Sequence, residues 1–133
     1  MMRWVFGAAA LLFLSAPAYA WTNDALPGCG NGDVVSRIVE RAAWAEHNTW
    51  HRGWIIHSVH RIHETALKDR GPSRIDRRYC LGVADLTNGR RMQIAYLIEA
   101  GMGFAGIGWR VEFCMPPEDP WRVYDAWCKA IRP

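Results

Sequence analysis

The stretch that decides the fold covers residues 79–99 and reads YCLGVADLTNGRRMQIAYLIE. Two runs rich in aliphatic and aromatic residues flank the dipeptide Asn88-Gly89. Asn-Gly strongly favours a two-residue type I′ turn, because both positions tolerate a positive φ. The stretch therefore predicts a β-hairpin in which Cys80 lies opposite Leu97. Its two expected strands are Tyr79 to Leu86 and Met92 to Glu99.

A third strand is expected after the hairpin, at residues 107–114, because its residues alternate in character. The apolar positions are Trp109, Val111 and Phe113, and the intervening positions are Arg110, Glu112 and Cys114. This alternation is typical of a strand with one covered face. The three strands predict an antiparallel meander that needs a covering element on one side.

A helix before the hairpin, from about Asp33 to His47, is expected to supply that cover. At about 100° per residue its apolar side chains gather on one side, as in a surface helix with one buried face. They are Val34, Val35, Ile38, Val39, Ala42 and Ala45. Candidates for the N-cap are Asn31, Gly32 and Asp33.

The sequence does not decide the secondary structure of two segments. Residues 54–65 fit helical spacing at some apolar positions, yet their β-branched content favours a long, bulged strand. Near the C-terminus, Asp119-Pro120 is suited to cap a closing helix, while the residues that follow equally suit a last strand. The stripe of that helix would be Trp121, Tyr124, Cys128 and Ile131.

The elements together predict an α+β fold, with one N-terminal helix packed on an antiparallel sheet of three to five strands. This order of elements is similar to that of cystatin-like and NTF2-like folds. The likeness concerns architecture and carries no function with it.

The first twenty residues are expected to be a removable signal peptide. Arg3 is its positive region, residues 4–14 are its apolar run, and Ala18-Tyr19-Ala20 is its small-x-small cleavage site. The apolar run is well short of the roughly 20 residues that a membrane-spanning helix needs. We therefore predict a single domain over residues 21–133 that is periplasmic or secreted and has no transmembrane segment.

Four cysteines follow the signal peptide, and an even number in an exported chain predicts two disulfides. They are Cys29, Cys80, Cys114 and Cys128. None is within two to four residues of another, which argues against a zinc site. The expected meander separates Cys80 and Cys114 by about 10 Å in each direction, too far for a disulfide. Two pairings stay open: Cys29–Cys80 with Cys114–Cys128, or Cys29–Cys114 with Cys80–Cys128.

The charge of the chain is mildly basic, with 16 Lys and Arg against 13 Asp and Glu. Removal of residues 1–20 takes one arginine and no acid, leaving 15 against 13, a net charge of +2. Nucleic-acid binders carry much denser basic faces. The arginines at 70, 74, 77, 78, 90 and 91 are spread along the hairpin and form no single patch. No nucleic-acid partner is therefore expected.

The glycine-rich run at residues 101–108 contains a literal G-x-G-x-x-G. A dinucleotide site needs a helix directly behind these glycines, and here a strand pattern follows, so a strand-connecting loop is expected. His57, His60 and His63 lie three residues apart, a spacing that gathers them poorly on a strand or a helix. We expect no metal site and no cofactor.

No pattern of nucleophile and base is present. The serines lack a nucleophile-elbow context, and the cysteines are expected to be paired. Glu99 and Glu112 are expected to neighbour each other as exposed surface charges. Trp44 is unusual, because it lies about 145° from the centre of the apolar helix face. Either the C-terminal segment, with Trp121 and Trp127, covers it, or it is an exposed anchor for a partner.

Three segments, RRYCLGVADLTNG, GFAGIGWRVEFC and DPWRVYDAWC, resemble a group of small exported proteins from rhizobia-like alphaproteobacteria. The resemblance implies a Gram-negative periplasmic location and brings no activity, so no functional residue is carried over. The sequence favours a non-enzymatic binding module whose partner is an envelope protein. The alternatives are a metal-binding protein using the histidines, or an inhibitor of a hydrolase using the glycine loop as a wedge.

Overall fold

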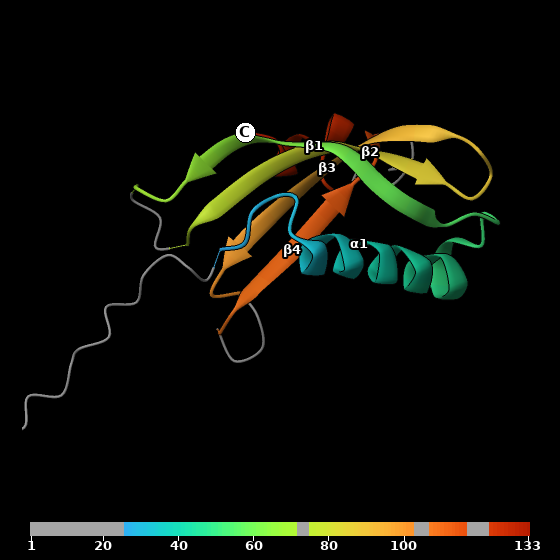
Figure 1. Ribbon diagram of the computed structural model, residues 1–133, viewed down its shortest axis with the longest axis horizontal. Coiled ribbons are helices and arrows are strands. Elements are labelled where there is room, and N and C mark those ends of the chain that lie inside the picture. Colours follow the sequence, from blue (N-terminus) through green and yellow to red (C-terminus); the bar gives the residue numbers. More distant parts are fainter. Residues whose placement is uncertain (1–25, 72–74, 103–106, 117–122) are drawn as a thin grey trace, which may run out of the picture.

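The computed structural model describes residues 26–71, 75–102, 107–116 and 123–133. The predicted signal peptide, residues 1–20, lies outside the described residues. One helix packs with a four-stranded antiparallel sheet, which confirms the predicted α+β fold (Figure 1). The helical elements are α1 (Gly32–Ala45), the π-helical turn η2 (Glu46–Trp50) and the 3₁₀ segment η5 (Ala126–Ile131), and the strands are β1 (Ile56–Lys68), β2 (Arg77–Leu86), β3 (Arg91–Ala100) and β4 (Trp109–Cys114).

Helix α1 begins at the predicted cap. The side chain of Asn31 accepts hydrogen bonds from the backbone N–H groups of Asp33 and Val34, at 2.9 and 3.4 Å. These bonds satisfy two of the N–H groups that the first turn leaves free. The α-helix ends two residues earlier than expected, because the chain continues as the turn η2, which His51 closes in a left-handed conformation.

The sheet has the strand order β1-β2-β3-β4, so neighbours in sequence are neighbours in space. The segment predicted as a long, bulged strand is β1, and it pairs with β2 through three register shifts. Gly82 of β2 lies opposite the register shift between His60 and His63 of β1. A methyl group on Gly82 would lie 3.1 Å from Cγ1 of Val59, so the close approach of β1 requires a glycine there.

The turn between β2 and β3 differs from the predicted type I′ turn. Asp85 lies opposite Arg91, and Cys80 lies opposite Tyr96 rather than Leu97. Only Gly89 in this turn has a positive φ, 81°, and the side chain of Asn88 accepts a hydrogen bond from a backbone N–H instead. The loop is longer because Thr87 exchanges hydrogen bonds with Ile55 at the start of β1.

The two faces of the sheet are covered by different segments. Helix α1 packs on one face, over residues that include Ile94 and Ile98 of β3. The C-terminal segment packs on the other, where Ile131 meets Leu97. Figure 1 shows α1 and the C-terminal η5 on opposite sides of the strands. Strand β3 is therefore buried on both sides over most of its length.

Each disulfide fastens one covering segment to the sheet. Cys29, just before α1, is bonded to Cys80, and Cys128 of η5 is bonded to Cys114. This is the first of the two predicted pairings. Cys80 belongs to the cluster under α1 and Cys114 to the cluster under η5, so these two face opposite sides of the sheet.

The C-terminal segment is neither the regular helix nor the strand that the sequence suggested. It is a short 3₁₀ element in which Trp127 and Cys128 both have left-handed backbone conformations. This path buries Cys128 and Ile131 while Trp127 points into solvent. Residues 117–122, and with them the predicted cap Asp119-Pro120 and Trp121, lie outside the described residues. Within the described ranges no helix is long and apolar enough to cross a membrane.

Candidate functional site

The most distinctive surface of the described structure runs along the outer side of α1, beside the edge of β4. It consists of Arg37, Arg41 and Trp44, which we call the α1 stripe. At about 100° per residue these three positions fall within about 60° of one another. Trp44 is 66% exposed, so of the two alternatives that the sequence left open, the described residues favour an exposed side chain over one covered by the C-terminal segment.

The two arginines of the stripe are fastened to the free edge of β4. Nη1 of Arg37 donates to the backbone oxygen of Trp109 at 3.3 Å, and Nη1 of Arg41 donates to the backbone oxygen of Val111. The guanidinium of Arg37 also lies over the indole of Trp109, 4.2 Å from its centroid. These contacts provide hydrogen-bond donors for two backbone carbonyl groups on the edge strand β4. They also hold both arginine side chains against that strand.

A charged network extends from the stripe across the face of the sheet that carries η5. Arg41 lies 3.6 Å from Glu112, and Arg110 bridges Glu112 to Glu99 at 3.4 and 3.0 Å. Glu99 also accepts from Nε of Arg77 at 2.9 Å. Glu99 is 7% exposed, so the expectation that it is a surface charge is wrong: three registered strands bring arginines to both of its sides.

Tyr124 closes this network. Its hydroxyl donates to Oε2 of Glu112 at 2.5 Å. Burial raises the pKa of Tyr124 most, and the hydrogen bond to Glu112 and the negative charge of that carboxylate raise it further. The phenol therefore stays protonated at neutral pH, where it acts as a donor and not as a base.

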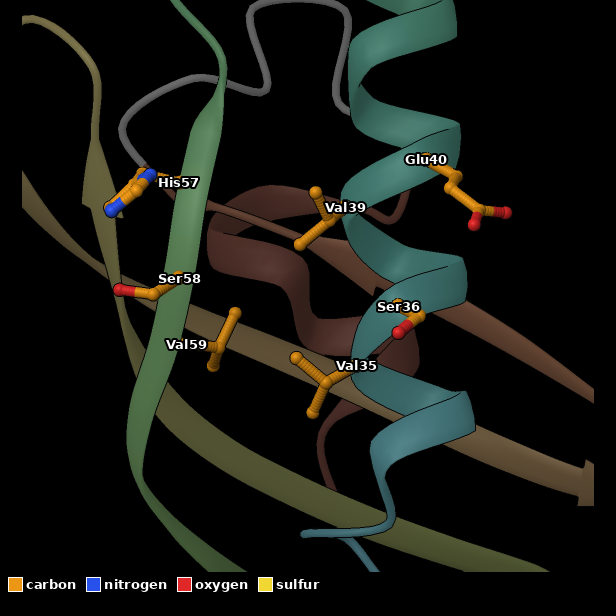
Figure 2. Close-up of a pocket in the computed structure, with 7 residues that line it drawn as sticks. All are labelled: Val35, Ser36, Val39, Glu40, His57, Ser58 and Val59. Atoms are coloured by element: carbon orange, nitrogen blue, oxygen red, sulfur yellow. The ribbon is translucent and has the colours of Figure 1, made fainter.

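A groove of about 380 Å³ lies between α1 and β1 (Figure 2). Its facing side chains are apolar: Figure 2 shows Val35 and Val39 of the helix pointing toward Val59 of the strand. Ser36 lines the helix side of the groove, and the carboxylate of Glu40 points away from it. The groove therefore brings no acid and base together for catalysis.

The three candidate histidines are not gathered into one site. Nδ1 of His60 lies 3.2 Å from the backbone oxygen of Val83, and Nδ1 of His63 lies 3.3 Å from the backbone oxygen of Arg61. His57 is exposed on the rim of the groove. Among the described residues, no three His, Cys, Asp or Glu side chains are placed to hold a metal ion.

Sequence reasoning missed a polar cluster on β1 and β2. Ser58 donates to Asp85 at 3.1 Å, His60 lies 3.5 Å from the same carboxylate, and Arg91 donates to it at 2.9 Å. The serine hydroxyl is bonded to the carboxylate and not to the imidazole. This order does not match a catalytic triad, in which the imidazole lies between the other two groups.

Sequence reasoning also missed the arrangement that follows α1. The guanidinium of Arg52 lies between two indoles, 4.1 Å from the centroid of Trp50 and 3.8 Å from that of Trp54. Its Nε donates to the buried carboxylate of Glu46 at 3.0 Å, which also accepts from the N–H of Gly53 at 2.6 Å. The spacing Trp-x-Arg-x-Trp at 50–54 was the available signal, but the chain is not extended there, since Trp50 ends η2 and His51 and Gly53 have positive φ values of 53° and 86°.

The pKa of Glu46 reflects a balance of opposing effects. Burial alone would raise it and is the largest single effect. The hydrogen bond from Arg52, that from the N–H of Gly53 and the charge of the guanidinium together outweigh burial and lower the pKa. Glu46 is therefore ionised at neutral pH and locks the chain that leaves the helix.

The glycine run joins β3 to β4. Gly101 and Gly108, at its two ends, have positive φ values of 67° and 76°, and the N–H of Gly101 donates to the oxygen of Gly108 at 2.6 Å. Strand β4 begins directly after Gly108, at Trp109, two residues later than predicted. Residues 103–106, which hold the centre of the proposed inhibitory wedge, lie outside the described residues.

No protein-family model, curated protein or solved structure matches this chain. The function is therefore inferred from the placement of its own residues.

Proposed function

We propose that this chain is an exported binding module, periplasmic or secreted, that contacts a protein partner of the cell envelope through the α1 stripe. The single observation that carries the proposal is the 66% exposure of Trp44 beside two arginines held by β4. Tryptophan and arginine are the residue types that most often dominate the energy of protein interfaces.

The order of the stripe supports a binding role. A side chain that is already fixed loses little rotamer freedom on binding, whereas each side chain that must be immobilised costs about 0.5–1.5 kcal/mol. Arg37 is held by a hydrogen bond and by the face of Trp109, and Arg41 is held by Val111 and Glu112. The two arginines of the stripe are therefore already ordered in the free protein, so they lose little conformational entropy when a partner binds.

The edges of the sheet make recognition by strand addition unfavourable. On β4, the arginines of α1 occupy the backbone oxygens of Trp109 and Val111. On β1, three register shifts and the exposed charged side chains of Arg61 and Lys68 interrupt the edge. Bulges and charges on edge strands oppose pairing with another chain. A partner is therefore expected to bind through side chains.

The proposed location outside the cytoplasm rests on the cysteines and on the first twenty residues. Two disulfides join distant segments of the fold, and the described residues contain no free cysteine. Such bridges persist in oxidising compartments. The n-region, apolar run and cleavage site of the sequence provide the route to such a compartment.

Site-directed photo-cross-linking in the native host tests the proposal. A photoreactive amino acid replaces Glu40, which is exposed on α1, and in a second strain Arg91, which is exposed on β3. We expect a specific cross-linked product from position 40 and not from position 91. Trp44→Ala should abolish the product, and Trp127→Ala, which removes a side chain 71% exposed elsewhere, should leave it unchanged.

Two results would overturn this proposal. One is a product from position 40 that is equally strong with Trp44→Ala. The other is the absence of any specific product from position 40 in protein that carries both disulfides and reaches the envelope.

A further inference from the structure

Some arginines in and around the α1 stripe form ion pairs with carboxylates and one does not. This difference indicates the chemistry of a partner. Arg41 faces Glu112, and Arg110 faces both Glu112 and Glu99. Arg37 has no carboxylate within ion-pair distance among the described residues. Its guanidinium instead donates from Nη1 to the oxygen of Trp109 and lies over the indole of that residue.

The guanidinium of Arg37 keeps most of its hydrogen-bonding capacity. It carries five N–H donors in a rigid plane, and one donates to Trp109. The contact with the indole of Trp109 helps to hold the guanidinium in place, and no described residue accepts from the other four N–H groups of this planar fork. A fork of this kind matches the two oxygens of a carboxylate.

The backbone positions of Arg37 and Trp44 have a defined spacing along the helix. Arg37 and Trp44 are seven residues apart, which at about 1.5 Å per residue places them about 10 Å apart along the helix. Their difference in angle is about 20°, so both side chains leave the same side of the helix. The stripe thus offers one aromatic and one cationic contact at a fixed spacing.

We propose that the α1 stripe recognises an acidic protein segment, in which a carboxylate pairs with Arg37 while an apolar surface about 10 Å away receives Trp44. This inference rests on the proposed function and adds the partner's chemistry. Charge complementarity selects this occupant, because Arg37, which pairs with no described carboxylate, favours an anion, and the exposed indole of Trp44 favours an apolar contact. In an extended segment, about 10 Å corresponds to about three residues.

A peptide-display experiment tests the inference and does not require the partner to be identified first. A library of random 12-residue peptides is selected on four forms of the intact, disulfide-bonded protein: wild type, Trp44→Ala, Arg37→Gln and Arg91→Gln. Arg91 is the matched control, because it is also exposed and its loss changes the net charge equally. We expect wild-type selections to be enriched in Asp or Glu two to four residues from a large apolar residue.

The four selections separate the outcomes. Arg37→Gln should lose the acidic enrichment while it keeps the apolar one, and Arg91→Gln should keep both. Peptides that depend on Trp44 but show no acidic enrichment, or keep it with Arg37→Gln, would overturn the inference and leave the proposed function standing. Selections that are the same with Trp44→Ala as with wild type would overturn both.

A reciprocal change on the peptide guards against effects of Arg37→Gln on the fold. The Kd of one selected peptide is measured by fluorescence anisotropy, with its acid unchanged or replaced by the matching amide. A charged hydrogen-bonded pair makes us expect about tenfold weaker binding of the amide peptide to wild type. With Arg37→Gln the two peptides should bind equally, and a tenfold difference that persists there would contradict the pairing.

Discussion

Gly82→Ala tests how closely β1 packs beside β2. Val59 and Ile62 of β1 pack against the hydrophobic core that lies under α1. A Cβ at Gly82 would lie 3.1 Å from Cγ1 of Val59, 3.3 Å from the backbone oxygen of His60 and 3.4 Å from Cγ1 of Ile62. Two of these contacts are tighter than most that real side chains make. One of them is to backbone, which cannot rotate away.

The expected cost follows from two opposing effects. Extra carbon in a filled space typically destabilises a protein by about 1–3 kcal/mol. Alanine also restricts the unfolded chain more than glycine does, which returns about 0.5–1 kcal/mol in a strand. From the middle of each range, the net loss of stability for Gly82→Ala is about 1 kcal/mol.

Urea unfolding of the oxidised protein, followed by tryptophan fluorescence, measures this loss. Val59→Ala removes the nearest contact, Cγ1, so in the double variant the added methyl is less crowded, although the contact with the backbone oxygen of His60 remains. We expect the double variant to be more stable than the sum of the single effects by about 1 kcal/mol. Gly28→Ala is the matched control, since a Cβ there meets nothing within 4 Å, and it should change stability by less than about 0.5 kcal/mol.

The reasoning fails if Gly82→Ala is as stable as wild type. It also fails if the effects of Gly82→Ala and Val59→Ala simply add. Either result would mean that the side chain of Val59 in β1 does not lie against Gly82 in β2.

Three further changes test other parts of the fold. Glu99→Gln should cost about 2 kcal/mol in urea unfolding, because the buried carboxylate accepts from two arginines, and a change below about 0.5 kcal/mol would contradict that. Cys114→Ala with Cys128→Ala should cost about 3 kcal/mol by loop entropy over a separation of 14 residues, with faster amide exchange on the η5 face, and unchanged exchange there would argue against the clamp. The pKa of Glu46 is lowered in the folded state, so the stability that it contributes is present above its ordinary value of about 4.3 and is lost as pH falls through the lower, folded value. The urea midpoint of wild type should therefore fall more steeply below about pH 4.3 than that of Glu46→Gln, and parallel curves would refute the assignment.

Local signals predicted the elements of this fold well. Asn31 and the apolar spacing of α1 depend on neighbours in the chain, and both were confirmed. The alternation of β4 predicted the strand but only one covered face, and Cys114 is buried on the other face because η5 packs there. The β2–β3 turn was predicted with the wrong type, because Thr87 bonds to Ile55, thirty-two residues away. The pattern of residues 88–89 holds no information about that contact.

The candidate site was less accessible to sequence reasoning. The exposure of Trp44 depends on where the C-terminal segment goes, and that path is set by Cys128 bonding to Cys114 on the far face of the sheet. The sequence left this pairing open. The contact between Arg37 and Trp109 joins residues that are 72 positions apart, so the periodicity within either element could not predict it.

The two edges of the sheet are protected by different means, and the difference bears on where a partner binds. Strand β1 protects its own edge by register shifts, which need nothing from other elements. Strand β4 is regular and depends on Arg37 and Arg41, which reach it from α1. Protection of that edge thus places two ordered arginines at the surface beside Trp44. The requirement that a short, regular edge strand be shielded from other chains is itself what assembles the surface that we propose for binding.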